Sequence, residues 1–218
     1  MKPLEKAGGV GALLLAVSFV LLIVSNAVIQ PGLGINGPAD QVNPAKMAPV
    51  ATTLRIVLSI PILFAVAFTL TTLGLNDRLQ NSSPTLMRIA LASGQGGAVL
   101  FLAAGMFSFV ALPALFTIGA QSPAGVTTAE LALGGAVADG LLAAAVFAAG
   151  WFVWLASWAA LRGGLPTPLR YLGLLFGAVS ILAFTFPPLM LLGAIVGLIW
   201  ALWMGIVLWQ AADVVLAR

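Results

Sequence analysis

Six long apolar stretches, separated by short polar or proline-rich segments, set the pattern of this chain. They cover about residues 8–29, 50–75, 86–111, 130–161, 171–186 and 189–212. A helix needs about 20 apolar residues to cross the hydrocarbon of a bilayer, where only helices and closed barrels satisfy every backbone hydrogen bond. The stretches lack the alternation of barrel strands. The pattern therefore predicts an all-α, polytopic membrane helix bundle, a single integral membrane domain over residues 1–218 with six transmembrane helices.

Prolines and glycines mark the interruptions between and within the stretches. Residues 30–49 hold four prolines and three glycines, which predicts turns and extended backbone in the one long loop. Pro61 predicts a kink in the second helix, and Pro113 predicts either the end of the third helix or a kink with more helix beyond it. The fourth stretch is over-long, which indicates tilt or an exposed first turn.

Lysines and arginines predict the orientation, because short cytoplasmic loops carry an excess of them. We expect both termini in the cytoplasm and the loop at 30–49 outside. The inner side then holds Lys2, Lys6, Arg78, Arg88, Arg162, Arg170 and Arg218, and the outer side only Lys46 and Arg55. Aromatic residues fall toward the same inner side and are predicted anchors at the headgroup boundary: Trp151, Trp154, Trp158, Trp200, Trp203, Trp209 and Tyr171.

The first stretch has a second interpretation. Lys2 and Lys6, an apolar run and then Ser25-Asn26-Ala27 look like a signal peptide with a small-residue cleavage site. Cleavage would leave five spans and place the new N-terminus outside. We favour a retained helix, because the run is longer than an ordinary signal-peptide core.

The composition limits the kinds of catalytic and metal-binding chemistry that this chain can perform. Of the residues 61% are apolar and 7% charged, against roughly 25% charged in soluble domains. With no cysteine and no histidine, disulfides, thiolate nucleophiles and the commonest metal ligand and general base are excluded. No paired carboxylates are spaced for catalysis, and the basic residues are dispersed. We expect no enzyme activity, no cofactor or metal, and no nucleic-acid partner.

Glycines predict how the helices meet, because small residues let two helix backbones approach closely in lipid. Gly173 and Gly177 lie on one face of the fifth helix, and Gly193 and Gly197 lie on one face of the sixth. We expect a seam within this hairpin, with a homodimer contact as the alternative. A second close crossing is expected between the third and fourth helices through Gly94, Gly96, Gly97, Gly134, Gly135 and Gly140.

Two ionisable residues stand inside predicted spans, where each costs about 2.5–3.5 kcal/mol at mid-membrane. Arg55 and Asp139 both fall in the outer half, and Glu130 and Asn26 share their layer. One hypothesis is an outward-facing pocket in which Asp139, Arg55 and Asn26 bind an ion or a small polar ligand. The hypothesis that we favour is a structural ion pair of Arg55 with Asp139 or Glu130.

Several short phrases carry a family resemblance. They are Ala7-Gly8-Gly9-Val10-Gly11-Ala12-Leu13-Leu14, Leu54-Arg55-Ile56, Gly164-Leu165-Pro166 and Tyr171-Leu172-Gly173-Leu174-Leu175. In these phrases and in its layout the chain resembles an uncharacterised family of bacterial integral membrane proteins, number four-three-eight-six in the series of domains of unknown function (DUF). The resemblance implies a six-helix fold and no mechanism.

Two functions remain as hypotheses for a protein of the bacterial cytoplasmic (inner) membrane. The first, which we favour, is a structural or partner-binding subunit without catalytic activity, whose partners are the lipid bilayer and other membrane proteins or a second copy. The second is a small transporter or ligand-binding protein that uses the outer polar site around Asp139 and Arg55. An enzyme acting on lipids ranks third.

Overall fold

The computed structural model describes residues 3–41, 43–121, 128–183, 185–186 and 188–214, and these are almost entirely helical, with no strand among them. Six long helices confirm the predicted all-α bundle. They are α1 (Pro3–Val24), α6 (Ile60–Leu79), α7 (Pro84–Gln121), α8 (Thr128–Ala160), α9 (Thr167–Ala183) and α10 (Leu189–Val214). Lys2 and Arg218, which entered the expectations above, lie outside the described residues.

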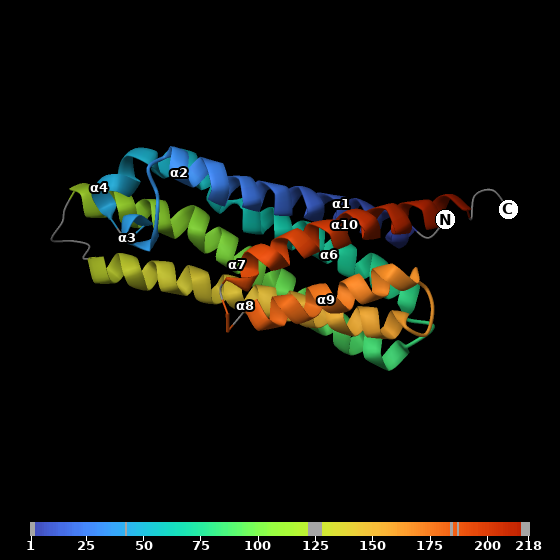
Figure 1. Ribbon diagram of the computed structural model, residues 1–218. Helices are drawn as coiled ribbons and strands as arrows, with labels where there is room; N and C mark the ends of the chain where they lie inside the picture. The colour runs from blue at the N-terminus through green and yellow to red at the C-terminus, as the bar shows by residue number, and fades with distance from the viewer. Residues whose placement is uncertain (1–2, 42, 122–127, 184, 187, 215–218) are drawn as a thin grey trace.

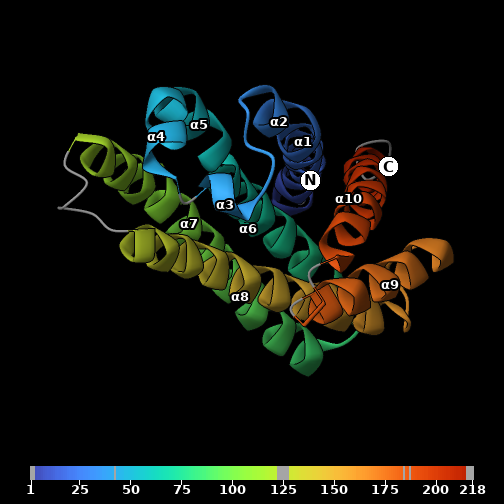
Figure 2. The ribbon, with the colours of Figure 1, turned by 60° about the vertical axis from the view of Figure 1, so that its left-hand side comes forward.

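The six helices form a closed ring in chain order (Figures 1 and 2). Each packs against the next, and α10 returns to pack against α1. The α6–α7 and α8–α9 turns lie at the end of the bundle where α1 begins and α10 ends, which we call the proximal end. The short helices that follow α1 lie at the opposite, distal end. Five of the six contacts in the ring thus join helices that follow one another in the sequence, and the contact between α1 and α10 closes it.

The segment expected to be a loop of turns and extended backbone contains short helices. They are η1 (a π-helix, Ser25–Ile29), α2 (Gln30–Gly32), α3 (Pro38–Gln41), α4 (Pro44–Met47) and η2 (a 3₁₀-helix, Ala48–Val50). Proline fixes a helical φ, and its missing N–H is not needed in a first turn. Here Pro31 and Pro49 are the second residues of α2 and η2, while Pro38 and Pro44 begin α3 and α4. The prolines start short helices instead of preventing them.

Two other prolines have different effects on their helices. The helix is interrupted at Ser59, which lies between α5 (Ala51–Leu58) and α6, two residues before Pro61. The Ser59 hydroxyl donates to the Ile56 carbonyl at 2.6 Å, and the predicted interruption is confirmed. By contrast, α7 continues through Pro113 to Gln121. Leu112 and Phe116, on either side of this proline, are buried, so tertiary packing holds the helix together there.

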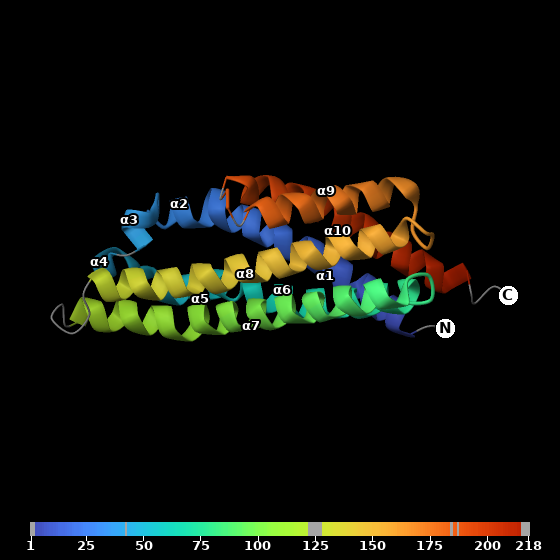
Figure 3. The same cartoon turned by 90° about the horizontal axis from the view of Figure 1, so that it is seen from below.

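Five helical segments are long and apolar enough to cross a membrane, and α9, with 17 residues, is shorter. Two single helices, α7 and α8, are longer than the ~40–45 Å of a typical bilayer with its headgroups. At 1.5 Å per residue the 38 residues of α7 extend for ~57 Å and the 33 residues of α8 for ~50 Å. Figure 3 shows both helices running past the α9–α10 turn to the distal end.

The apolar interior accordingly has two parts. The main core lies between the six helices. A separate distal cluster joins the segment after α1 to the far parts of α7 and α8. Its buried members are Ile35, Met47, Leu54, Leu112, Phe116, Leu131 and Ala138.

Glycines set the closest helix contacts, and the seam expected between α9 and α10 is formed in part. In α9, a Cβ atom on Gly177 would lie 2.8 Å from the Gly150 carbonyl oxygen of α8. A Cβ on Gly173 would meet both Ser157 of α8 and Trp200 of α10.

The two glycines of α10 face α9. A Cβ on Gly193 would meet Val179 of α9 at 3.6 Å. Gly197 faces Phe176 of α9 and also Phe19 of α1.

The crossing of α7 with α8 is close at Gly97, whose Cβ would meet the backbone of Ala145 and Ala149 at 3.2–3.3 Å. Two further glycines expected at this crossing also meet the other helix: a Cβ on Gly94 of α7 would meet Phe152 of α8, and one on Gly134 of α8 would meet Leu115 of α7. The other three, Gly96, Gly135 and Gly140, face open space.

Side-chain hydrogen bonds add to these contacts. Gln95 of α7 donates to the Thr72 hydroxyl of α6 at 2.6 Å. Ser93 of α7 donates to the Ala148 carbonyl of α8 at 2.9 Å. Such bonds between helices are the ordinary use of polar residues in lipid.

Candidate functional site

The space between the six helices is filled by aromatic side chains. Phe19 of α1 contacts Phe64 of α6 and Phe176 of α9, with ring centroids 5.0 and 5.9 Å apart. The remaining contacts link Phe64 and Phe68 to Phe101 of α7, Phe68 to Phe152 of α8, and Phe176 to Trp200 of α10. Every long helix thus contributes at least one ring to a continuous buried chain.

Trp200 differs from its expected position at the headgroup boundary. Its side chain is 0% exposed and packs on Phe176, because its face of α10 is turned toward the ring interior. Of the other expected anchors, Trp154 is partly exposed, and Trp151, Trp158, Trp203, Trp209 and Tyr171 are exposed.

The structure does not join Arg55 to Asp139. Leu54 and Ala138 face the distal cluster, and the next residue along a helix points about 100° away. Arg55 on α5 and Asp139 on α8 are therefore both exposed. Within the described part of the chain neither makes an ion pair or a hydrogen bond, so the favoured structural pair of Arg55 is not formed.

The other members of the predicted outer site are also exposed. Asn26 donates to the Leu22 carbonyl of its own helix at 2.9 Å and lies 3.5 Å from Gln30. Glu130 is exposed in the first turn of α8. Lys46 is paired with Asp40 at 2.5 Å, and this hydrogen bond, with one from the Asn36 N–H, holds the pKa of Asp40 below its usual value.

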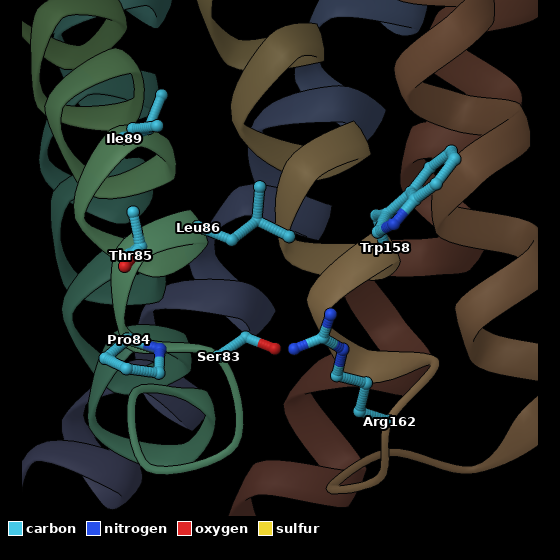
Figure 4. A pocket seen from close by; sticks show the side chains of 7 residues that line it. All are labelled: Ser83, Pro84, Thr85, Leu86, Ile89, Trp158 and Arg162. Carbon is cyan, nitrogen blue, oxygen red and sulfur yellow. The ribbon is translucent and has the colours of Figure 1, made fainter.

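A groove at the proximal end is the better-formed site. It has a volume of about 360 Å³ and lies between the start of α7 and the end of α8. Its lining residues are Ser83, Pro84, Thr85, Leu86, Ile89, Trp158 and Arg162 (Figure 4). None of the seven is acidic.

The polar groups of the groove converge. Ser83 precedes Pro84 at the start of α7 and is 4% exposed, and its hydroxyl oxygen has no hydrogen-bond partner among the described residues. Figure 4 shows this hydroxyl and the Arg162 guanidinium pointing toward one another across the groove. Thr85 and Leu86 belong to the first turn, where backbone N–H groups have no acceptor within the helix. The site therefore offers donors and positive charge.

Two other proximal arginines, Arg78 and Arg170, have structural partners. Arg78 donates through Nε to the Gly164 carbonyl at 2.6 Å and lies 3.9 Å from the Glu5 carboxylate. Arg170 donates to the carbonyls of Leu165 at 2.6 Å and Leu161 at 3.5 Å. In the described part of the chain Arg162 makes no such bond, so its guanidinium is available to a ligand.

Sequence reasoning missed this groove, because Arg162 counted only toward orientation. The one signal available was Ser83-Pro84, a capping residue followed by proline, which marks a helix start. That signal does not show that the end of α8 lies beside it.

Known proteins do not add to this description. Comparison with protein-family models, with curated proteins and with solved structures finds no match. Among the described residues there is also no group of three or more Asp, Glu, His or Cys side chains that could hold a metal.

Proposed function

We propose that this chain is a multi-pass protein of a bacterial cytoplasmic membrane, with its proximal end in the cytoplasm, and that it binds another membrane protein without catalysing a reaction. The membrane placement is supported by the five helical segments long enough to cross a bilayer. The orientation is supported by the basic residues. Of those described, Lys6, Arg78, Arg88, Arg162 and Arg170 are proximal, and Lys46 and Arg55 are distal.

The aromatic chain favours a binding role over the transporter alternative. A transporter needs a polar site near the middle of the membrane that opens to water. Here the space enclosed by the six helices is occupied by packed aromatic side chains such as Phe64, Phe101 and Phe152. Their buried neighbours are mostly alanine, leucine and methionine.

The observation that carries the proposal is the length of the α7–α8 hairpin. Hydrocarbon is ~30 Å thick, so a ~57 Å helix could fit within it only at a tilt of about 58°, beyond the 0–40° seen for transmembrane helices. The far part of the hairpin therefore extends above the outer surface. Its side chains nevertheless remain apolar: Leu133 is 67% exposed and Ile118 is 49% exposed.

This projecting part of α8 has one open face. Leu131, Gly134 and Ala138 face α7 and are buried, whereas the opposite arc is exposed. We call that arc the open face. It consists of Ala132, Leu133, Ala136, Val137 and Gly140.

The occupant that fits the open face is a helix of a second membrane protein. Small residues let a helix backbone approach closely, and nothing lies within 4 Å of a Cβ on Gly140. Asp139 is at the edge of the face and has no ion-pair partner in the described chain. A basic side chain on the partner would complement it.

Substituting Gly140 tests the docking without disturbing the monomer. We expect Gly140→Leu to weaken the complex about tenfold or more, because an added side chain overpacks a close helix contact. Gly96→Leu is the matched control, since Gly96 also faces open space, but on α7. The measurement is the amount of a complex of defined stoichiometry, separated by native electrophoresis from gently solubilised membranes.

Cross-linking from position 139 identifies the neighbour in that complex. A different membrane protein with a Lys or Arg near Asp139 supports the proposal. Cross-links to a second copy of the chain alone, or a monomer in native membranes, would overturn it, as would equal losses in Gly140→Leu and Gly96→Leu.

A further inference from the structure

We propose that the proximal groove binds the phosphate of an anionic phospholipid from the cytoplasmic leaflet. The inference rests on the membrane placement proposed above, and adds a specific lipid site to it. It is carried by the Ser83 hydroxyl, the start of α7, Arg162 and an apolar wall above them.

The Ser83 hydroxyl is the first reason. A buried polar group without a partner is unfavourable, by roughly 1–3 kcal/mol. The Ser83 side chain lines the groove, its hydroxyl oxygen is buried, and the hydroxyl points toward the Arg162 guanidinium (Figure 4). An acceptor in the groove, such as a phosphate oxygen, would satisfy it.

The charges in the groove favour an anion. A helix N-terminus carries partial positive charge and free N–H groups, and binds phosphates in many proteins. The start of the 38-residue helix α7 forms one side of the groove, and Arg162 lies on the other. Arginine presents a planar set of donors that matches phosphate oxygens.

The order of residues along the groove favours a lipid. In Figure 4 Ser83 and Arg162 lie at the level of the turns, Leu86 and Trp158 above them, and Ile89 beyond. Ile89 and Trp158 are each 54% exposed. A phospholipid has the same order, because its phosphate lies at the membrane surface and its acyl chains run toward the membrane centre.

Native mass spectrometry of the full chain in detergent tests the site. The probes are dioleoylphosphatidylglycerol, dioleoylglycerol, which has the same chains without phosphate, and inorganic phosphate. We expect selective retention of one phosphatidylglycerol. Arg162→Gln should lower its apparent affinity about tenfold and Ser83→Ala about threefold, as expected for lost charge-assisted and neutral hydrogen bonds.

Matched variants keep the test decisive. Arg88→Gln removes the same charge from an exposed residue of α7 that does not line the groove, and should change affinity less than twofold. Ser83→Thr keeps the hydroxyl and should retain binding. If Ser83→Ala does not fold, the comparison of Arg162→Gln with Arg88→Gln carries the test.

Several results would overturn the proposal. These are equal retention of the two lipids, equal losses in Arg162→Gln and Arg88→Gln, or inorganic phosphate binding as tightly as the phospholipid. The readout is at the opposite end of the molecule from the open face of α8, so failure here and failure of the partner-binding function can be told apart.

Discussion

Single glycines decide how closely the helices of this protein approach. Among the described glycines, the closest approach to another backbone is between α1 and α6, where a Cβ atom on Gly74 would lie 2.6 Å from the Cα of Gly8. The number of glycines in the sequence predicts close packing in general. Which glycines meet is decided by the helix rotations, and these depend on all neighbours at once. No sequence pattern therefore indicates that Gly8 and Gly74 meet, whereas Gly96 and Gly140, which were expected at a close helix crossing, face open space.

Replacing Gly74 by alanine should destabilise the protein by about 1–3 kcal/mol, because the backbones of α1 and α6 would have to separate. Gly96→Ala should be neutral or slightly stabilising, since alanine favours helix by up to ~1 kcal/mol and meets nothing there. Thermal unfolding of both variants in detergent measures the difference. Equal midpoints would contradict this description of the α1–α6 contact.

At the scale of elements, turns and breaks are held by specific polar contacts. The α8–α9 turn needs Gly163 and Gly164 at φ values of +130° and +92°, which side chains disfavour. Arg78 then ties the turn to α6 through the Gly164 carbonyl. The sequence predicts a turn here from its glycines and prolines, but not this bond, which joins residues 86 positions apart.

Arg78→Gln should loosen that turn, because it removes a charge-assisted hydrogen bond and the contact with Glu5. For a partly exposed arginine we expect a loss of about 1–2 kcal/mol in local stability. Trypsin should then cut after Arg162 roughly 5–30 times faster, if cleavage follows local opening. Arg88→Gln is the control, and an unchanged cleavage rate in Arg78→Gln would refute the role of this contact.

At the scale of the whole molecule, the six helices enclose a centre filled with apolar side chains, and the α7–α8 hairpin projects beyond the α9–α10 turn (Figure 3). Aromatic rings from all six long helices occupy the centre. This arrangement predicts that water does not pass through the ring. The projecting part of α7 and α8 instead carries exposed apolar side chains, such as Ile118 and Leu133.

Single cysteines can test both the filled centre and the orientation without background, because the chain has none of its own. Cysteine at the buried positions Ala67 or Ala98 should resist a water-soluble maleimide. Exposed Gln41→Cys should react in intact cells, and exposed Thr167→Cys only after the membrane is opened. Rapid labelling of Ala98→Cys would indicate a water-filled path through the bundle. Labelling of Thr167→Cys in intact cells would show that the protein has the opposite orientation in the membrane.

Local sequence properties were enough to predict the six long helices, most of their approximate ends and the interruption near Pro61, although α7 continues to Gln121 and not to about residue 111. These follow from local properties, namely apolar run length and the backbone restrictions of proline, which act whatever the tertiary contacts are. The expectation for residues 30–49 failed because proline breaks a helix interior but suits a helix start, and short helices carry too little periodicity to be recognised.

Which residues meet depends on the tertiary packing. Trp200 is in the core, Gly177 of α9 faces α8, and Arg55 and Asp139 point outward without joining. Likewise, Ser83 and Arg162, 79 positions apart in the sequence (162 less 83), share a groove only because α7 and α8 pack antiparallel. The reason is geometric: a rotation of 100° per residue makes the burial of each side chain depend on how its helix is turned against its neighbours. No local pattern in an almost uniformly apolar helix specifies that rotation.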